Sequence, residues 1–483
     1  MRVKNLFGRS LAAALLALGA ADASADAPPP TVVALALDPA ADASLRNMRL
    51  LNATLNARDH QRVEIACAPG AASCAFPLVG GARATGRTGL ELVIGRGARL
   101  VGDYNLSRWA VDATNDFESL VAFDECARVT VRGERDRARR AVSWWREAAL
   151  SATIDGGGRP WWLRKLAGNA TGAPGDPKTP NALGFYWCDD VVVRDVRVTN
   201  SPSFGVFVQE SQRVLVERCA VTVDLLVTPP PTAVPVWALN TDGFDVGGRD
   251  LVLRDVYVRN ADDSVAIKPS APSLRFACTT NVTVENATLI GVGASVGSVH
   301  PKFDRYCVRG VTFRDVAMPG TMKGIYVKTD NTTDGLPGDG ALVDDVLYEN
   351  VRVDGAVWWP IWIGPQQQHN DLEVTACPFA FPFGPGPAPD CLGARQANVT
   401  GVVLRDVTVT NSRRAFSGMI LGNALSPAGP WRVVLERVRV DKPIGCASAR
   451  VGLIGTDASV FFTAPNEASA GYANCTFYDA AAA

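Results

Sequence analysis

The sequence predicts an all-β fold: a right-handed single-stranded parallel β-helix, or solenoid, with a short N-terminal capping helix and long loop insertions. The first observation is a repeat. A Val-rich strand pattern recurs at intervals of between about 20 and 56 residues, at 191–198, 214–221, 251–258, 282–289, 311–318, 346–353, 402–409 and 433–440. A unit of this size cannot bury a hydrophobic face alone, so consecutive units must stack on one another.

The second observation is the composition. The 44 glycines and 31 prolines exceed what a helical protein would carry, and they suit many short strands joined by turns. The third is the lack of helical stretches between the repeats, which argues against a Rossmann or TIM-barrel fold. A leucine-rich repeat would need a helix in each unit, and a propeller would need longer units of four strands.

The N-terminus has the pattern of a secretory signal peptide. Basic residues at 2, 4 and 9 precede a short apolar run at 11–21, and the small residues 23–25 (ASA) follow as a cleavage site. The apolar run is too short to span a bilayer, and no later segment has the length of a transmembrane helix. We therefore expect residues 1–25 to be removed and the protein to be secreted into the extracellular space.

Residues 26–62 are expected to form a linker and the capping helix. Asp38 can cap that helix and Pro39 suits its first turn. The apolar residues of its predicted buried face are Leu45, Met48, Leu51 and Leu55. Residues 63–483 are then expected to form the parallel β-helix domain.

Four segments interrupt the strand pattern of that domain. Residues 134–147 form a basic, helix-like insert, and the loops at 229–235, 331–341 and 366–396 break the spacing of the repeats. Long loops on a rigid scaffold usually carry function or cover something, so we expect one of these two roles for the three loops.

Secretion makes the eleven cysteines plausible disulfide partners. Pairs close in sequence are Cys67–Cys74, Cys278–Cys307, Cys377–Cys391 and Cys446–Cys475. The odd count leaves at least one thiol unpaired, with Cys126, Cys188 and Cys219 as candidates for burial in the core. No C-x-x-C pair occurs, which argues against a zinc or redox site. Eight N-x-S/T sequons would make the protein a glycoprotein if its source glycosylates secreted proteins.

The charge balance bears on the partners. The formal net charge of −1 gives no sign of nucleic acid or an anionic membrane as a partner. We expect no cofactor, no metal site and a monomer.

An acidic stretch between residues 240 and 268 is the candidate for the chemistry. It reads NTDGFDV at 240–246 and NADDSVAIK at 260–268, with one Val-rich repeat unit between the two motifs. A shift of twenty residues places Asp242 on Asp262 and Val246 on Ala266. If the chain coils with that period, the carboxylates of Asp242, Asp262 and Asp263 gather on one surface.

Clustered carboxylates suit the cleavage of glycosidic bonds. That reaction needs an acid to protonate the leaving oxygen and a base to activate water, or a nucleophile. Carboxylates on adjacent coils lie roughly 5 Å apart, and like charges that close raise at least one pKa, so that a proton remains available. By contrast, Asp155, Asp195 and Asp255 are expected to be turn residues, and Asp245 to support the cluster from behind.

The motifs at 240–245 and 262–268 resemble those of glycoside hydrolase family 28, the polygalacturonase or pectinase family. GVGASVGS at 291–298 looks like its G-H-G-x-S-x-G-S, and GIYVKT at 324–329 looks like its G-x-R-I-K-T. The resemblance extends from about residue 87 to 440. It implies an inverting hydrolase of pectin or a related plant or algal wall polysaccharide, with Asp262 as general acid and with Asp242 and Asp263 activating water.

The substrate-binding residues are expected around these acids. The resemblance points to Asn240, Lys268 and Lys328. It also exposes two departures, because Val292 replaces the motif histidine and Tyr326 replaces the motif arginine.

A tyrosine cannot make the bidentate bond that an arginine makes to a carboxylate, so a neutral sugar becomes plausible at the cleavage site. Tyr326 and Lys328 should share the outer face of their strand, while Ile325 and Val327 point inward. Trp362 is expected on the outer face beside Tyr326, where it either stacks on a sugar or belongs to a packed hydrophobic strand under the long loop. His300 could restore the missing polar contact from a loop, or it belongs to an ordinary surface loop.

Two other functions remain open from the sequence. A polysaccharide lyase on the same fold would use carboxylates to hold Ca²⁺ and a basic residue to abstract a proton next to a uronate carboxyl. The protein could also be a non-catalytic carbohydrate-binding wall protein, in which case the replacements at Val292 and Tyr326 would reflect the loss of catalytic activity.

Overall fold

The protein is described here by a computed structural model. It describes residues 30–109, 111, 117–134, 150–166, 179–224, 240–300, 306–329, 340–368, 377–378, 391, 397–426, 429–463 and 473–481. The predicted signal peptide, the 229–235 loop, nearly all of the 134–147 insert and most of the 331–341 and 366–396 loops lie outside these residues.

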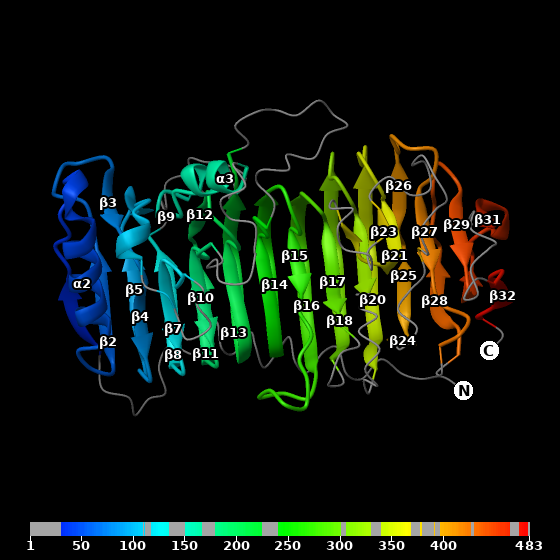
Figure 1. Ribbon diagram of the computed structural model, residues 1–483, viewed down its shortest axis with the longest axis horizontal. Helices are drawn as coiled ribbons and strands as arrows, with labels where there is room; N and C mark the ends of the chain where they lie inside the picture. Colours follow the sequence, from blue (N-terminus) through cyan, green and yellow to red (C-terminus); the bar gives the residue numbers. More distant parts are fainter. Residues whose placement is uncertain are drawn as a thin grey trace.

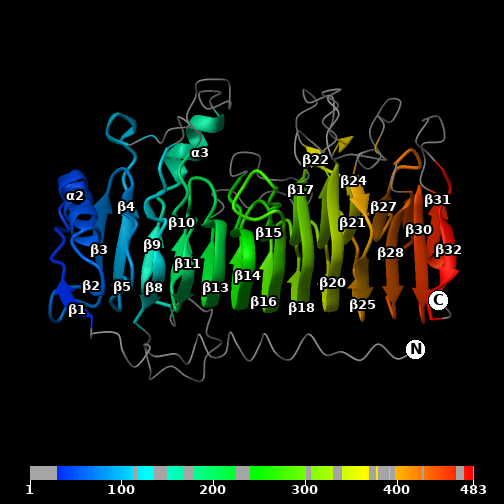
Figure 2. The ribbon, with the colours of Figure 1, turned by 90° about the horizontal axis from the view of Figure 1, so that it is seen from below.

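The described chain is a stack of parallel β-coils that forms one long body (Figures 1 and 2), so the predicted parallel β-helix is confirmed. Three stacks of paired strands run along its length. The first stack consists of β4 (Ala82–Thr85), β7 (Val121–Asp124), β10 (Leu183–Tyr186), the start of β13 (Val206–Thr222), the start of β14 (Phe244–Arg259), β15 (Val265–Ile267), β17 (Ala294–Val299), β19 (Ile325–Thr329), β21 (Ile361–Pro365), β27 (Gly418–Leu421), β29 (Ile444–Ala447) and β31 (Phe461–Thr463).

The long strands β13 and β14 run from the first stack through the second into the third. The strands β16 (Thr279–Ile290), β18 (Cys307–Pro319) and β20 (Ala341–Asp354) run from the second stack into the third. The second stack contains β1 (Thr31–Ala34), β2 (Gln61–Ile65), β5 (Glu91–Ile94), β8 (Ala127–Gly133), β11 (Asp189–Arg194), β16 (Thr279–Ile290), β18 (Cys307–Pro319), β20 (Ala341–Asp354), β24 (Ala397–Val399), β25 (Val402–Arg405), β28 (Trp431–Glu436), β30 (Ala449–Ile454) and β32 (Thr476–Asp479). The third stack contains β3 (Cys74–Leu78), β6 (Ala98–Gly102), β9 (Thr153–Asp155), β12 (Arg197–Thr199) and β26 (Thr408–Thr410). A separate short pair joins β22 (Gln367–Gln368) to β23 (Cys377–Pro378).

The core fills the inside of the coils, because successive side chains of a strand point to opposite faces. In the first stack Phe244, Val265, Ala294 and Ile325 follow one another in register and are buried in the core cluster. The residue after each of these points outward. The three predicted acids lie immediately before β14 and β15, beside outward residues such as Ser295.

Turns between the stacks repeat from coil to coil. Asp195 and Asp255 have positive φ angles of 57° and 53°, the left-handed conformation that Asp and Asn adopt more readily than most residues. In the next coil Asn286 takes the same conformation, and its Nδ2 donates to Asp255 Oδ1 at 2.5 Å. The prediction that Asp195 and Asp255 are turn residues is confirmed.

The N-terminal end differs from the prediction in two respects. The helix α2 (Ser44–Leu55) closes that end of the stack (Figure 1), but it follows a 3₁₀ turn, η1 (Ala41–Ala43), and begins at Ser44 rather than near Pro39. Asp38 instead accepts a bond from the Ala40 backbone N–H at 2.8 Å, which closes a local turn. The β-helix also starts earlier than residue 63, since β1 lies in the segment predicted as linker and pairs with β2.

Further short helices were not predicted. Helix α3 (Arg159–Leu166) follows the glycine-rich 156–158 turn, and its Trp161 and Trp162 are buried. Short 3₁₀ turns lie at η2 (Leu106–Arg108) and η5 (Ala458–Val460). Among the described residues no helix has the length and apolar character needed to cross a membrane.

All four predicted disulfides are confirmed. Their S–S bonds join Cys67–Cys74, Cys278–Cys307, Cys377–Cys391 and Cys446–Cys475. Cys126, Cys188 and Cys219 are unpaired and buried, as predicted.

Candidate active site

The register of β14 and β15 brings the acidic residues together. Asp245 pairs with Ala266 and Val246 with Ile267, a shift of twenty-one residues. The predicted shift of twenty, which placed Val246 on Ala266, is therefore wrong by one residue. The backbone N–H of Gly243 donates to the carbonyl oxygen of Asp263 at 2.8 Å, so Asp242 lies beside Asp263 rather than beside Asp262.

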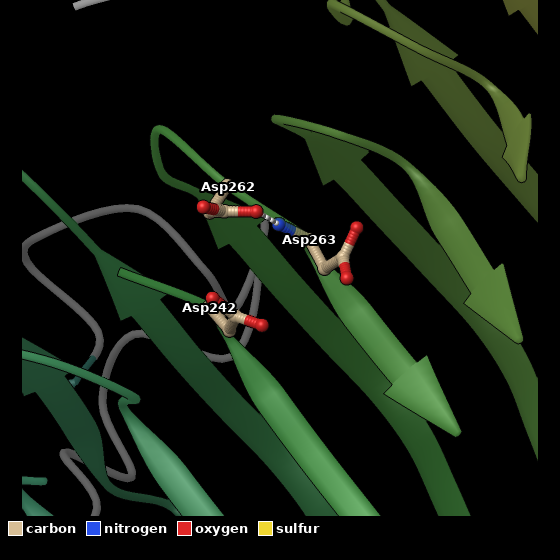
Figure 3. A group of neighbouring side chains, drawn as sticks. All are labelled: Asp242, Asp262 and Asp263. Atoms are coloured by element: carbon tan, nitrogen blue, oxygen red, sulfur yellow. Dashed lines mark hydrogen bonds between the residues drawn. The ribbon is translucent and has the colours of Figure 1, made fainter. Parts of the chain in front are cut away.

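The three carboxylates still form one cluster, because Asp262 and Asp263 are consecutive. Asp242, Asp262 and Asp263 each offer a carboxylate oxygen, and these oxygens all lie within 4.8 Å of one another (Figure 3). Asp242 and Asp263 are buried, whereas Asp262 is half-buried and is the most accessible of the three. The predicted gathering of the three acids agrees with this geometry.

Backbone groups fix the orientation of Asp262. Its Oδ2 accepts from the Asn240 N–H at 2.8 Å, and its Oδ1 accepts from the Asp263 N–H at 2.9 Å. Asn240 has a positive φ of 62° and is exposed, so the described contact to the acids comes from its backbone.

A buried asparagine joins the two acidic motifs. The Asn260 side-chain amide donates to the carbonyl oxygens of Thr241 and Asp263, each at 2.8 Å. A Cβ on Gly291 would lie 1.9 Å from the Asn260 Oδ1, so only glycine fits at that position. Asn260 therefore holds the turn that contains Asp242 and the turn that contains Asp263 in a fixed position relative to each other.

Asp263 is held as an anion. Lys328 Nζ lies 2.5 Å from its Oδ2, and Ser295 Oγ donates to its Oδ1 at 2.7 Å. Burial alone would raise the pKa of Asp263, but Lys328, Lys268 and the hydrogen bonds together hold that pKa below its usual value. The pKa of Lys328 is raised despite its burial, because it faces Asp263.

Asp242 shares a second lysine with Asp245. Lys268 Nζ lies 3.1 Å from an oxygen of Asp245 and 3.7 Å from an oxygen of Asp242. Burial is the main cause that raises the pKa of Asp245 to about 6 and the pKa of Asp242 well above its usual value, and neighbouring carboxylates add to both. Asp245 is fully buried behind the cluster.

The pKa values of the three acids are shifted in different directions. Burial, followed by the Asp263 charge, raises the pKa of Asp262. Asp263 stays ionised to low pH while Asp242 and Asp262 retain protons longer, which is the split between acid and base that glycosidases need.

Tyr326 and Val292 lie in an apolar cluster next to the acids. Tyr326 and Lys328 share the outer face of β19, with Ile325 and Val327 in the core, as predicted. The Tyr326 hydroxyl accepts from the Gln367 N–H at 2.9 Å, and only 2% of the residue is exposed. It is therefore a buried ring rather than an open hydrogen-bonding group.

Lys323 is a residue that the sequence reasoning missed. Its Nζ lies 3.8 Å from the centroid of the Tyr326 ring, and the side chain is buried. Burial, followed by the nearby charge of Lys328, lowers the pKa of Lys323 well below its usual value. The loss of the motif arginine at 326 was the signal that could have prompted a search for another cation in the same segment.

Trp362 lies where predicted but is covered. It pairs with Tyr326 in the next coil, and its Nε1 donates to the Pro365 carbonyl oxygen at 2.8 Å. The residue is fully buried in the apolar cluster that contains the Cys377–Cys391 disulfide. A ring without exposed surface cannot stack on a sugar, so of the two roles expected for Trp362 the structure supports packing and rules out stacking.

His300 follows β17 and is half-buried. Its ring packs edge-on against Tyr306, with 6.1 Å between the ring centroids. Its predicted contact with substrate stays a prediction.

The lyase alternative would require the three carboxylates to hold a Ca²⁺ ion. Three carboxylate oxygens within 4.8 Å could hold a cation. Here Lys328 and Lys268 already face Asp263 and Asp242, so a bound ion would have to displace two ammonium groups. The arrangement favours acid–base chemistry over metal binding.

A parallel β-helix in which carboxylates and lysines cluster beside one stack of strands suits the class of enzymes that cleave polysaccharides. Within that class, the chain belongs to glycosyl hydrolases family 28, whose sequence model matches residues 99–380. The match contains all of the acidic motifs, and it confirms the resemblance inferred from them.

Curated relatives and solved structures agree. An exopolygalacturonase of Platanus acerifolia is 27% identical over 218 residues, which are 44% of this chain and 52% of the relative. A probable endopolygalacturonase C of Aspergillus aculeatus is 26% identical over 230 residues, 47% of this chain and 52% of the relative. The chain thus spans about half the length of the curated relatives it matches.

Two solved structures show the fold. A polygalacturonase from Erwinia carotovora ssp. carotovora has a TM-score of 0.57 at 18% identity, covering 89% of this chain and 99% of that one. A family 28 exopolygalacturonase of Yersinia enterocolitica has a TM-score of 0.61 at 12% identity, covering 94% of this chain and 78% of that one. These likenesses support the right-handed form of the β-helix.

Proposed function

We propose that this protein is a secreted hydrolase that cleaves α-glycosidic bonds in pectin-type, galacturonate-containing polysaccharide. The observation that carries the proposal is the cluster of Asp242, Asp262 and Asp263, with carboxylate oxygens within 4.8 Å of one another and pKa values shifted in opposite directions. Membership of glycosyl hydrolases family 28 and the polygalacturonase relatives support the same substrate class.

In the proposed reaction Asp262 is the general acid. It gives its proton to the glycosidic oxygen as the bond from that oxygen to the anomeric carbon breaks. Asp263, which Lys328 holds ionised, takes a proton from the water whose oxygen attacks the anomeric carbon on the opposite face, and Asp242 beside it helps to hold that water in place. The raised pKa of Asp262 and its greater exposure support the acid role, and Lys328 supports an ionised Asp263.

Inversion of the anomeric centre is the stereochemical part of the proposal. Typical inverting enzymes separate their two carboxyl groups by roughly 6.5–9.5 Å, and retaining enzymes by roughly 5–5.5 Å. The compact cluster here is closer to the second range, so inversion rests on the family resemblance. Proton NMR of the first-formed product tests it: a β-anomer from an α-linked substrate supports inversion, and an α-anomer contradicts it.

The sugar at the cleavage site is proposed to be neutral. The motif arginine that would bind a carboxylate is replaced by Tyr326, and Lys328 already contacts Asp263. Asn240, Lys268 and His300 remain the proposed substrate contacts. A galacturonate-containing polymer with neutral residues, such as rhamnogalacturonan, fits this arrangement.

Secretion and a monomeric state complete the proposal. The signal-like residues 1–25 and four disulfides suit an oxidising extracellular compartment. N-terminal sequencing of the protein from culture medium and its mass in solution test these two points.

The deciding experiment measures reducing-sugar release from polygalacturonan, rhamnogalacturonan and xylogalacturonan, with the product lengths analysed. Hydrolysis of one of these polymers by the parent protein, and its loss in Asp262→Asn, would support the proposal. An unsaturated product that absorbs in the ultraviolet and disappears with EDTA would instead point to a lyase. Binding of the polymers without any cleavage would point to a wall-binding protein.

A further inference from the structure

A strip of aromatic rings extends from the carboxylate cluster along the outward face of the first stack. Its members are Phe204, Phe207, Tyr186 and Trp187. Lys268, which faces Asp242 and Asp245, has its Nζ 5.4 Å from the centroid of the Phe204 ring. Successive ring centroids then lie 5.6, 5.7 and 6.4 Å apart. The rings therefore form a continuous path from the acids toward the N-terminal coils.

The strand register places this strip beside the acids. Phe207 pairs with Asp245 in the following coil and with Gly184 in the preceding one. Its neighbours Val206 and Val208 are in the core, so Phe207 points to the same outward side as Asp245. Paired strands are about 4.8 Å apart, which makes the strip the next surface that a bound chain would meet on this side.

Tyr186 is fixed across the floor of the strip. A Cβ on Gly184 would lie 2.6 Å from a carbon of the Tyr186 ring, so the ring occupies the space that a side chain at 184 would need. The Tyr186 hydroxyl and Ser119 Oγ are hydrogen-bonded at 2.8 Å. A glycine and a hydroxyl thus hold this ring in one orientation.

The rings of the strip are accessible. Phe204, Phe207 and Tyr186 are half-buried, and Trp187 is 41% exposed. Trp187 also has a positive φ of 51°, a backbone conformation that bulky residues rarely adopt. Arg83 lies over the Tyr186 ring at 5.4 Å but is paired with Asp124 at 2.8 Å. The cations over the Tyr186 and Phe204 rings are thus already paired with carboxylates, and the remaining accessible surface of the strip is mainly aromatic, which suits the apolar faces of sugar rings.

We infer that the aromatic strip binds, by stacking, the sugar residues of the polysaccharide that extend beyond the cleavage site toward the N-terminal coils. The inference rests on the proposed function, because the occupant is the continuation of the chain that the acids cleave. Its support is the unbroken contact from Lys268 at the cluster to Trp187 at the far end.

The test compares substrates of increasing length. Phe207→Ala and Tyr186→Ala should each raise KM for long oligosaccharides by about tenfold, with kcat nearly unchanged, and should leave the shortest cleaved substrate unaffected. Tyr186→Phe keeps the ring and should retain most of the long-chain affinity. Phe477→Ala, which removes a 43% exposed ring at the other end of the molecule, is the matched control and should have no effect. Equal KM changes at all lengths, or none, would overturn the inference.

A binding measurement separates this inference from the proposed function. In the Asp262→Asn background, the dissociation constant for rhamnogalacturonan and polygalacturonan oligomers is measured with and without Phe207→Ala. Weaker binding of long oligomers only supports the strip even if the parent protein cleaves nothing. Unchanged binding, or a change of oligomeric state that shows the rings to be covered by a second copy of the chain, contradicts it.

Discussion

The Lys328 ammonium lies 2.5 Å from a carboxylate oxygen of Asp263, although the coil that contains β17 lies between the coils to which the two residues belong. Both side chains are nearly inaccessible to solvent. The pair consequently fixes the charge of Asp263, and it ties a lysine that the family resemblance assigns to the substrate into the catalytic cluster.

Removal of this lysine should be costly. Lys328→Met leaves Asp263 as a buried carboxylate without its partner, which typically destabilises a protein by about 3–5 kcal/mol. The free energy of unfolding from urea titration measures this loss. The double variant Lys328→Met/Asp263→Asn should recover a large part of it, and a surface control, Arg309→Met, should change little because Arg309 is 61% exposed. A single variant as stable as the parent would show that the pair does not have this role.

The pH dependence of stability should reveal the raised pKa of Asp245. Its pKa rises from 3.8 to about 6 in the folded protein. Between these pH values the folded state binds more protons than the unfolded state, so this group stabilises the protein at low pH and its contribution is lost as pH rises toward 6. Urea titrations from pH 4 to 7 should show a smaller decline for Asp245→Asn than for the parent. Parallel curves for the two proteins would contradict the assignment.

The buried Lys323 should lower stability at neutral pH. Its folded pKa is well below 10.5, so the unfolded state binds the additional proton and the stability of the parent rises as pH increases toward 10.5. Lys323→Met keeps a similar volume without the charge, and it should raise the free energy of unfolding at pH 7 and flatten this rise. Lower stability of Lys323→Met at both pH 7 and pH 10 would be the opposite result.

Substrate choice should depend on Tyr326. Tyr326→Arg introduces a group that can make a bidentate bond to a carboxylate, and we pair it with Lys323→Met to remove the adjacent cation. The ratio of kcat/KM for polygalacturonan to that for rhamnogalacturonan should rise by about tenfold. Tyr326→Phe is the control, because it keeps the ring and loses only the bond from Gln367. An unchanged ratio would mean that residue 326 does not select the sugar.

The sequence predicted the fold because one alternating pattern recurs in coil after coil, and stacking is the only way for such units to bury their apolar faces. It predicted the meeting of Asp242 with Asp262 and Asp263 even though the register was wrong by one residue, because the two later acids are consecutive. The pairing of β14 with β15 sets a shift of twenty-one, and counting from Asn240 to Asn260 could not reveal it.

The surroundings of the acids were harder to predict. Trp362 points outward as expected, but it is buried in an apolar cluster that also contains Cys377, Cys391 and Met419, which follow it in a loop and in the next coil. Local periodicity gives the face of a strand and says nothing about what packs on that face. The position of Lys323 over Tyr326 likewise depends on a turn outside any strand pattern.

The central claim is that Asp262 is the general acid of a glycoside hydrolase, and the initial rate of reducing-sugar release by Asp262→Asn on the best polymer substrate tests it most directly. The rate should fall by about 10²–10⁴-fold, with the thermal midpoint nearly unchanged, while Asp315→Asn at an exposed turn should keep the parent rate. A rate for Asp262→Asn equal to that of the parent would contradict the claim.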